Sequence, residues 1–138
     1  MSGSAANGYS GKPVWQKLGL TAGQRVFVHD APGDYAMLTG MPEGFVRTVG
    51  PRATFDLAHL FVTRANDLAT QLSRIIGKLP AGAPLWISWP KRTSGVATDI
   101  TEDTLRTLAL PLGIVDVKVC AIDATWSGLK FVWRKERR

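Results

Sequence analysis

The order of elements in this 138-residue chain predicts an α/β fold, a three-layer sandwich around a mostly parallel sheet. Short apolar runs alternate with segments of helical periodicity along the chain. The run LAHLFV, the amphipathic segment at 65–79 and the run PLWISW form a strand, helix, strand unit, which requires a parallel crossover. The last two apolar runs, IVDVKVCAI and LKFVW, are joined by a short polar turn and predict an antiparallel hairpin at a sheet edge.

The remaining elements follow from local signals. Short helices are expected over 14–18 and 35–38, and strands over 25–29 and 45–49. Such alternation of strands and helices favours a Rossmann-like or methyltransferase-like sheet that ends in the C-terminal hairpin.

Two helix starts carry capping signals. Thr63 is the expected N-cap of the helix at 65–79. Asp99 and Glu102 resemble a capping box for the next helix, with Ile100 stapled to Leu105.

Composition bounds the class of protein. With 45% hydrophobic and 20% charged residues, the chain predicts one globular domain over 10–134. Residues 1–9 are rich in Gly, Ser, Ala and Asn and are expected to be disordered, and 135–138 form a basic tail. No apolar run is long enough for a membrane span and no signal peptide is visible, so we expect a cytoplasmic protein. Cys120 is the single cysteine, which excludes an internal disulfide and favours a small buried side chain.

The net charge of +6 makes nucleic acid a candidate partner, because clustered Lys and Arg neutralise phosphates. The last five residues carry four positive charges and one negative, a net +3, which is half of that total. A frayed, solvated tail explains this clustering equally well. An exposed edge strand in the hairpin also makes a homodimer conceivable.

Ligands of open parallel sheets gather beyond the carboxyl ends of the strands, and polar residues gather at those ends here. Lys91 offers charge to an anionic ligand, while Ser94 and Gly95 offer a hydroxyl group and close backbone approach. A solvated loop is the competing interpretation. The candidate ligand-binding residues are His29, Asp30, Trp89, Lys91, Ser94, Gly95, Thr98, Asp99, Asp123, Trp126, Ser127 and Lys130.

Catalytic signatures are weaker. His29 could act as a general base with Asp30 or Asp123, although a hydrogen-bonded structural role competes, and His59 within LAHLFV favours a structural role. No nucleophile elbow and no metal-ligand spacing is visible, so no catalytic residue and no metal is predicted.

The segments SWPKRTSGVATDIT and DVKVCAIDATWSGLKFV, with YSGKPVWQKLGL and RVFVHDAPGDY, resemble a family of small bacterial proteins known only as a domain of unknown function. The resemblance covers Tyr9 to Arg134 and implies a fold but no activity. Its family-like positions are Ser88, Pro90 and Gly128, together with the candidates above from Trp89 to Lys130.

The order of elements also resembles the core of class I methyltransferases, which use S-adenosylmethionine. Such enzymes carry a glycine-rich loop after the first strand, where this chain has His29 to Asp34 with one glycine. They carry an acid for the ribose after the second strand, where this chain has Gly50, Pro51 and Arg52.

Three hypotheses result. The first is a binding or regulatory module without a cofactor, which takes a small anionic ligand or a protein partner through Lys91, Ser94, Asp99 and Trp126. The second is a minimal S-adenosylmethionine-dependent methyltransferase with Asp30 or Gly33 at the cofactor, and the third is a nucleic-acid-binding accessory protein.

Overall fold

A computed structural model describes residues 11–138, so the expectation of disorder over 1–9 lies outside the described residues. Its main elements, in chain order, are α2 (Val14–Leu18), β1 (Arg25–His29), α3 (Tyr35–Thr39), β2 (Arg47–Val49), β3 (Leu57–Phe61), α4 (Ala65–Ile75), β4 (Leu85–Pro90), α5 (Glu102–Ala109), β5 (Ile114–Ala121) and β6 (Trp126–Trp133). Short 3-10 turns lie at Ile76–Lys78, Arg92–Ser94, Leu110–Leu112 and Lys135–Arg137. None of the helices in this range is long and apolar enough to cross a membrane.

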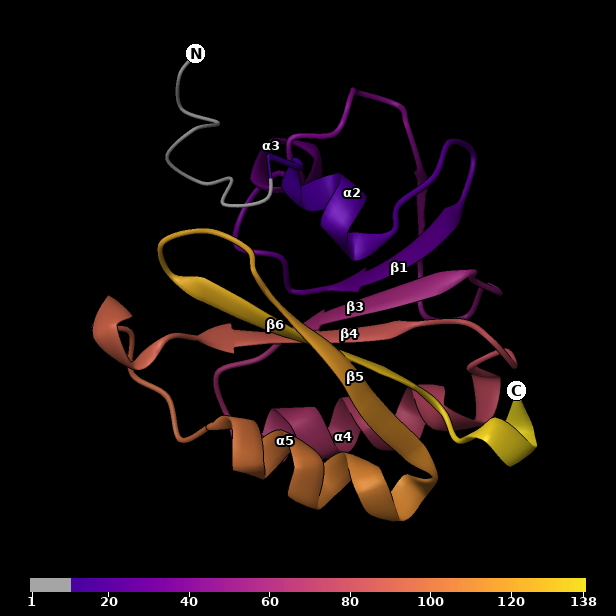
Figure 1. Cartoon of the computed structure of the whole chain (residues 1–138), viewed down its shortest axis with the longest axis vertical. Helices are drawn as coiled ribbons and strands as arrows, with labels where there is room; N and C mark the ends of the chain where they lie inside the picture. Colours follow the sequence, from indigo (N-terminus) through magenta and orange to yellow (C-terminus); the bar gives the residue numbers. More distant parts are fainter. Residues whose placement is uncertain (1–10) are drawn as a thin grey trace.

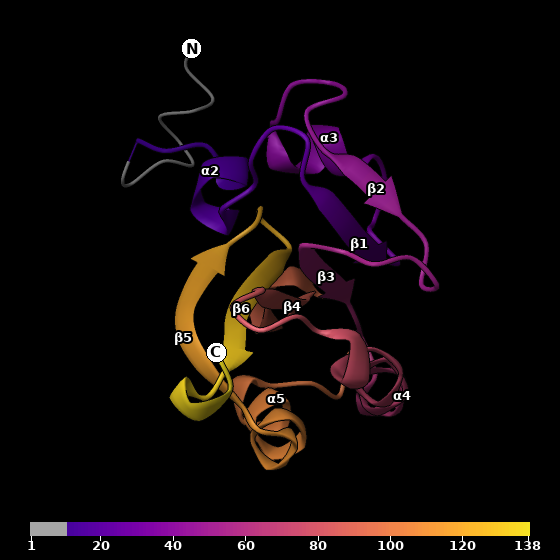
Figure 2. The same cartoon turned by 90° about the vertical axis from the view of Figure 1, so that its right-hand side faces the viewer.

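One six-stranded sheet forms the centre of the molecule, in the order β2-β1-β3-β4-β6-β5 (Figure 1, with β2 labelled in Figure 2). β1 pairs in parallel with β2 and β3, and β3 pairs in parallel with β4. β6 lies between β4 and β5 and is antiparallel to both. The predicted α/β class, with a mostly parallel sheet and a C-terminal antiparallel hairpin, is confirmed.

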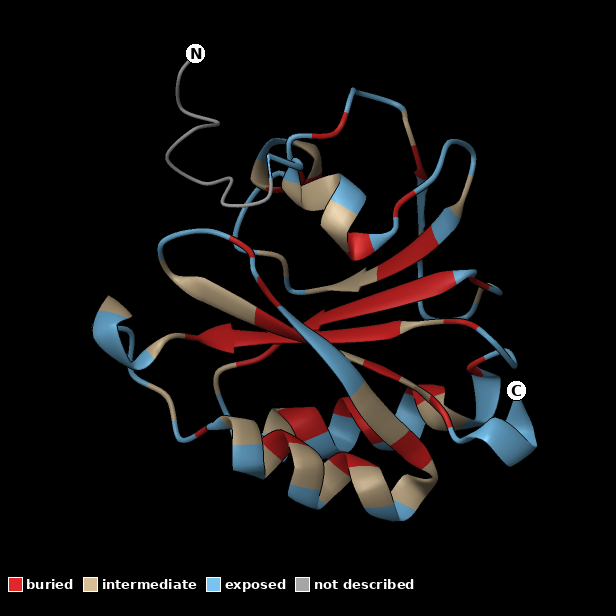
Figure 3. Cartoon of the chain, viewed as in Figure 1, coloured by how far each residue is buried: buried red, intermediate tan, exposed pale blue. Residues whose placement is uncertain are grey.

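Helices cover both faces of the sheet, with α4 and α5 on one side and α2 and α3 on the other (Figure 2). Alternation along β3 divides the core between them: Leu60 packs with the α4/α5 face, whereas Leu57 and Phe61 pack with the α2/α3 face. Every residue of β3 and β4 is buried, as expected for central strands covered on both faces (Figure 3).

The caps of α4 and α5 differ from both sequence predictions. α4 has Arg64 as its N-cap without a side-chain bond, and the Ala65 N–H donates instead to Oδ1 of Asp99 at 2.7 Å. The predicted cap at Thr63 was therefore wrong, and the Thr63 carbonyl accepts from Oγ1 of Thr98 at 2.7 Å. Asp99 thus caps the neighbouring helix.

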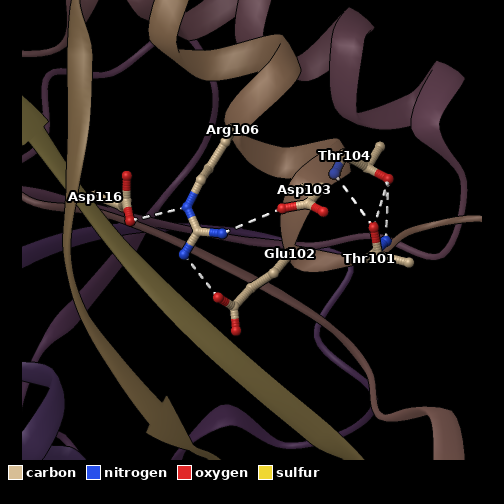
Figure 4. Close-up of polar contacts among 6 residues, drawn as sticks. All are labelled: Thr101, Glu102, Asp103, Thr104, Arg106 and Asp116. Atoms are coloured by element: carbon tan, nitrogen blue, oxygen red, sulfur yellow. Dashed lines mark hydrogen bonds and ion pairs between the residues drawn. The ribbon is translucent and has the colours of Figure 1, made fainter.

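The capping box of α5 lies two residues later than predicted, at Thr101 and Thr104 (Figure 4). Ile100 and Leu105 are both buried and take the positions of the predicted hydrophobic staple around this cap. The helix is also tied to β5 by Arg106, whose Nε donates to Asp116 at 3.1 Å and whose Nη2 donates to Glu102 at 2.7 Å. These hydrogen bonds, with Glu102 first, raise the pKa of the guanidinium.

The C-terminal residues contact the domain. The Arg137 guanidinium lies 4.1 Å from the centre of the Trp133 ring, and Nε of Arg138 donates to the Trp133 carbonyl at 2.5 Å. β5 forms an outer edge of the sheet and exposes Val117 and Val119, so pairing with a second copy stays a prediction.

Candidate functional site at the carboxyl edge

The sheet reverses its direction of growth at β1, because β2 lies on one side of β1 and β3 on the other. Open α/β sheets bind ligands outside the carboxyl ends of the strands at such a switch point. His29 ends β1, and Asp67 lies in the first turn of α4, which follows β3. Nε2 of His29 lies 3.1 Å from Oδ2 of Asp67 and 3.6 Å from Oδ2 of Asp30. We call His29, Asp30 and Asp67 the switch-point cluster.

Two carboxylates around one imidazole can hold a positively charged group or a proton. The cluster offers three ligand atoms within 4.8 Å of one another, so its residue types also suit a metal ion. Asp30 has φ +55, the left-handed conformation, which Asp tolerates better than most residues. Its side chain is 76% exposed and accessible to a ligand, whereas the His29 side chain is only 19% exposed.

Sequence analysis paired His29 with Asp30 or Asp123. The structure places Asp30 beside His29 and holds Asp123 in the β5–β6 turn, where its Oδ1 accepts from the backbone of Thr125 and Trp126. Asp67 was missed, because 38 residues separate it from His29. One feature of the sequence could have pointed to Asp67, namely an acid in the first turn of the helix that follows the strand next to β1.

The loop after β1 differs from a phosphate-binding loop. Oδ1 of Asp34 accepts from the N–H groups of Ala36 and Met37, so the start of α3 is satisfied by its own cap. After β2 the chain continues with Gly50, Pro51 and Arg52, which offer no carboxylate to ribose hydroxyls.

Lys91 ties two loops of the carboxyl edge together. Its Nζ donates to the Asp123 carbonyl at 2.8 Å, and its backbone N–H donates to the Thr125 carbonyl at 2.7 Å. Trp126, the first residue of β6 after this turn, is half-buried with its ring 5.4 Å from that of Phe61. Lys91, Asp123 and Trp126 therefore form one structural unit, and the Lys91 ammonium has an intramolecular partner.

The other candidates in the β4–α5 loop make no side-chain bond to this unit, although the Ser94 N–H donates to the Lys91 carbonyl at 3.0 Å. Oγ of Ser94 accepts from the Val96 N–H, Gly95 adopts φ +79, and Thr98 and Asp99 anchor the loop to the start of α4. The loop encloses a hollow of ≈ 610 Å³ with Trp89 and the first residues of α5.

Ser127 and Lys130 lie further along β6 than Trp126. Ser127 pairs with Trp89 and Ala121. Lys130 lies opposite Lys118, and burial together with the Lys118 charge lowers its pKa. The twelve predicted residues thus occupy the switch point, the loop hollow and the hairpin rather than one site.

A buried polar network lies beneath α3. The Tyr35 hydroxyl is 2.7 Å from Nδ1 of His59, and Nε2 of His59 is 2.7 Å from Oγ of Ser88. Burial lowers the pKa of His59 to about 3, so the imidazole is neutral, and burial raises the pKa of Tyr35. The structural role predicted for His59 is confirmed. Burial likewise raises the pKa of Cys120, which is buried as predicted.

Comparisons with known proteins identify the class of fold. No family model and no curated protein matches the chain. A protein of the NADB-Rossmann superfamily from Streptococcus agalactiae has a TM-score of 0.57 at 13% identity, over 88% of this chain and 68% of that one. A SAM-dependent methyltransferase from Aquifex aeolicus has a TM-score of 0.60 at 16% identity, over 86% of both chains.

The fibrillarin pre-rRNA processing protein of Methanococcus jannaschii has a TM-score of 0.54 at 11% identity, over 83% of this chain and 68% of that one. These identities show the fold alone. The strand order and these similarities therefore define a Rossmann-like fold of the methyltransferase-like type.

Proposed function

We propose that this protein binds S-adenosylmethionine at the switch-point cluster. The observation that carries the proposal is the position of Asp30 and Asp67 beside His29, where this fold binds its ligands. The similarity to a SAM-dependent methyltransferase from Aquifex aeolicus supports the same reading.

The charge of the cluster distinguishes between two ligand classes of Rossmann folds. A pyrophosphate dinucleotide needs free amide groups and glycines, whereas Asp30 and Asp34 flank this loop and Asp34 occupies the first amides of α3. S-adenosylmethionine carries a sulfonium, an ammonium and a carboxylate group and is positive overall, so two carboxylates of the protein attract its two cationic groups. The cluster therefore favours the cationic ligand over the dinucleotide.

The residues fit this ligand at its methionine end and not at its ribose end. Gly50, Pro51 and Arg52 provide no carboxylate after β2. A hydrogen bond to a charged group contributes about 1.5–3 kcal/mol, so its loss weakens binding by roughly ten- to a hundredfold. Low affinity is the expected result.

The first hypothesis, a small anionic ligand, has less support from the geometry. Lys91 and Trp126 belong to the hairpin unit, Asp99 caps α4, and Ser94 bonds to its own loop. These four side chains do not converge on one ligand.

The test is calorimetric titration of the wild type, Asp30→Asn and Asp67→Asn with S-adenosylmethionine and S-adenosylhomocysteine. Asn keeps the shape and a hydrogen-bonding oxygen but removes the charge. Each variant should raise Kd for the sulfonium compound roughly two- to fivefold, as for exposed charge pairs, and should affect the neutral thioether less. Glu43→Gln, an exposed acid elsewhere, is the matched control.

Absence of binding by the wild type at millimolar concentration would exclude the proposal. Equal affinity of the wild type and both Asn variants for the sulfonium compound would show that it binds elsewhere.

A further inference from the structure

The hollow beneath the β4–α5 loop is separate from the switch-point cluster and carries its own chemistry. It has a volume of ≈ 610 Å³, within the range of roughly 300–1,000 Å³ of small-molecule sites. Trp89 lines it at the end of β4, and the loop and the first residues of α5 complete it.

The loop that forms the hollow is held in place at both ends. Lys91 bonds to the β5–β6 turn at one end, and Thr98 and Asp99 bond to Thr63 and Ala65 at the other. Between them, Ser94 accepts from the Val96 N–H. The hollow is therefore pre-formed, which lowers the ordering cost of binding.

Trp89 provides an unused hydrogen-bond donor. Its side chain belongs to the core and the residue is 7% exposed. The indole N–H groups of Trp86 and Trp133 donate to carbonyl oxygens, whereas that of Trp89 has no partner among residues 11–138. Every fully buried polar side-chain atom in this range has a hydrogen-bond partner, so the unpartnered Trp89 N–H is at least partly exposed. Trp89 lines the hollow.

The remaining lining residues set the polarity of a ligand. Ile100 and Val96 are apolar, and Val96 is 43% exposed. Asp99 and Glu102 each have one carboxylate oxygen without a bond among the described residues. Arg92 lines the hollow without a carboxylate partner in the same range. Two acids against one guanidinium disfavour a phosphate or carboxylate ligand.

We infer that this hollow binds a neutral planar heteroaromatic ring of the nucleobase class. Such a ring offers an acceptor nitrogen or oxygen to the Trp89 N–H and amino hydrogens to the carboxylates of Asp99 and Glu102. Its faces suit the apolar walls, and the Arg92 guanidinium can stack on them. A hydrocarbon ligand, which has no acceptor atom, would leave the indole donor unpaired.

The test follows the Trp89 indole N–H in proton–nitrogen correlation spectra of the labelled protein, assigned by its absence in Trp89→Phe. Adenosine, guanosine, cytidine and uridine are titrated separately. At least one nucleoside should shift this resonance saturably, with a smaller shift of the Trp126 indole.

A second variant blocks the hollow without touching the core. Ala97 is an exposed lining residue, so Ala97→Trp should fill the space and weaken nucleoside binding at least tenfold, or about 1.4 kcal/mol. Thr107→Trp adds the same side chain on the exposed side of α5, outside the hollow, and should leave binding unchanged.

Asp67→Asn separates this site from the proposed S-adenosylmethionine site, because nucleoside binding in the hollow should be unaffected by it. An unchanged Trp89 resonance at the solubility limit of all four nucleosides would overturn the inference. So would equal binding by Ala97→Trp and Thr107→Trp.

Discussion

The two faces of the sheet are stabilised in different ways. The α4/α5 face is a continuous apolar core, in which Leu68, Leu72 and Leu105 interdigitate with the sheet. The α2/α3 face contains shorter helices and encloses the network of Tyr35, His59 and Ser88. The α4/α5 face therefore relies on apolar packing alone, whereas the α2/α3 face, which we call the polar face, combines an apolar cluster with buried hydrogen bonds beneath a five-residue helix.

The largest effect is expected from a cavity in the apolar face. Leu68 is 0% exposed, so Leu68→Ala should lower the free energy of unfolding by about 2–5 kcal/mol. Urea denaturation followed by circular dichroism measures this. Val117→Ala truncates an aliphatic side chain at an exposed position and should stay within about 0.5 kcal/mol of the wild type. Similar values for both variants would contradict the assignment of this core.

The stability of the α2/α3 face should be reduced by substitutions that leave buried polar groups without a hydrogen-bond partner, even where little volume is lost. His59→Leu keeps a side chain of similar size but leaves the hydroxyls of Tyr35 and Ser88 without this partner. The free energy of unfolding should fall by roughly 2–4 kcal/mol. Replacing all three residues, in the variant Tyr35→Phe, His59→Leu, Ser88→Ala, removes every unpaired group and should restore most of that stability. Denaturation of the single and triple variants tests this, and a triple variant less stable than His59→Leu would refute the role of the network.

The same network makes the polar face sensitive to acid. The pKa of His59 is lowered from 6.5 to about 3, so the unfolded state binds a proton that the folded state excludes. Stability is therefore fully present above pH 6.5 and is lost as pH falls toward 3, at about 1.4 kcal/mol per pH unit. At pH 5 the expected loss is roughly 2 kcal/mol. The triple variant, which has no His59, should lack this part of the pH dependence of stability. If the free energy of unfolding falls with pH in the same way for the wild type and the triple variant, His59 is not the source of the acid sensitivity.

The sequence could predict the elements of both faces but not the contacts between residues far apart in the chain. The amphipathic helices, the crossover and the hairpin of the chain follow from local periodicity, and the structure confirms them. Contacts between distant segments carry no such period. The pairs His29–Asp67 and Ala65–Asp99 join residues 38 and 34 positions apart, and neither was predicted.

The candidate site was predicted only as an edge of the sheet. Sequence could place Trp89, Lys91 and Asp123 near strand ends, but not show that the Lys91 ammonium is bound by the Asp123 carbonyl or that Trp89 keeps a free indole N–H. Those properties depend on loop geometry, which the type of residue does not determine.

The smallest effect is expected at the junction between α4 and α5 on the apolar face. Asp99→Ala removes the acceptor of the Ala65 N–H and should cost about 0.5–2 kcal/mol, the usual value of an N-cap. Thr101→Ala removes the corresponding acceptor of the Thr104 N–H and is the matched variant for α5. Because the Asp99 bond spans two helices, its loss should raise amide hydrogen exchange in the first turn of α4, whereas loss of Thr101 should raise exchange at the start of α5. If exchange rises only around Asp99 itself, the Asp99 cap does not stabilise α4. The N-terminus of α4 would then be held, like the rest of that helix, by apolar packing of Leu68 and Leu72 against the sheet.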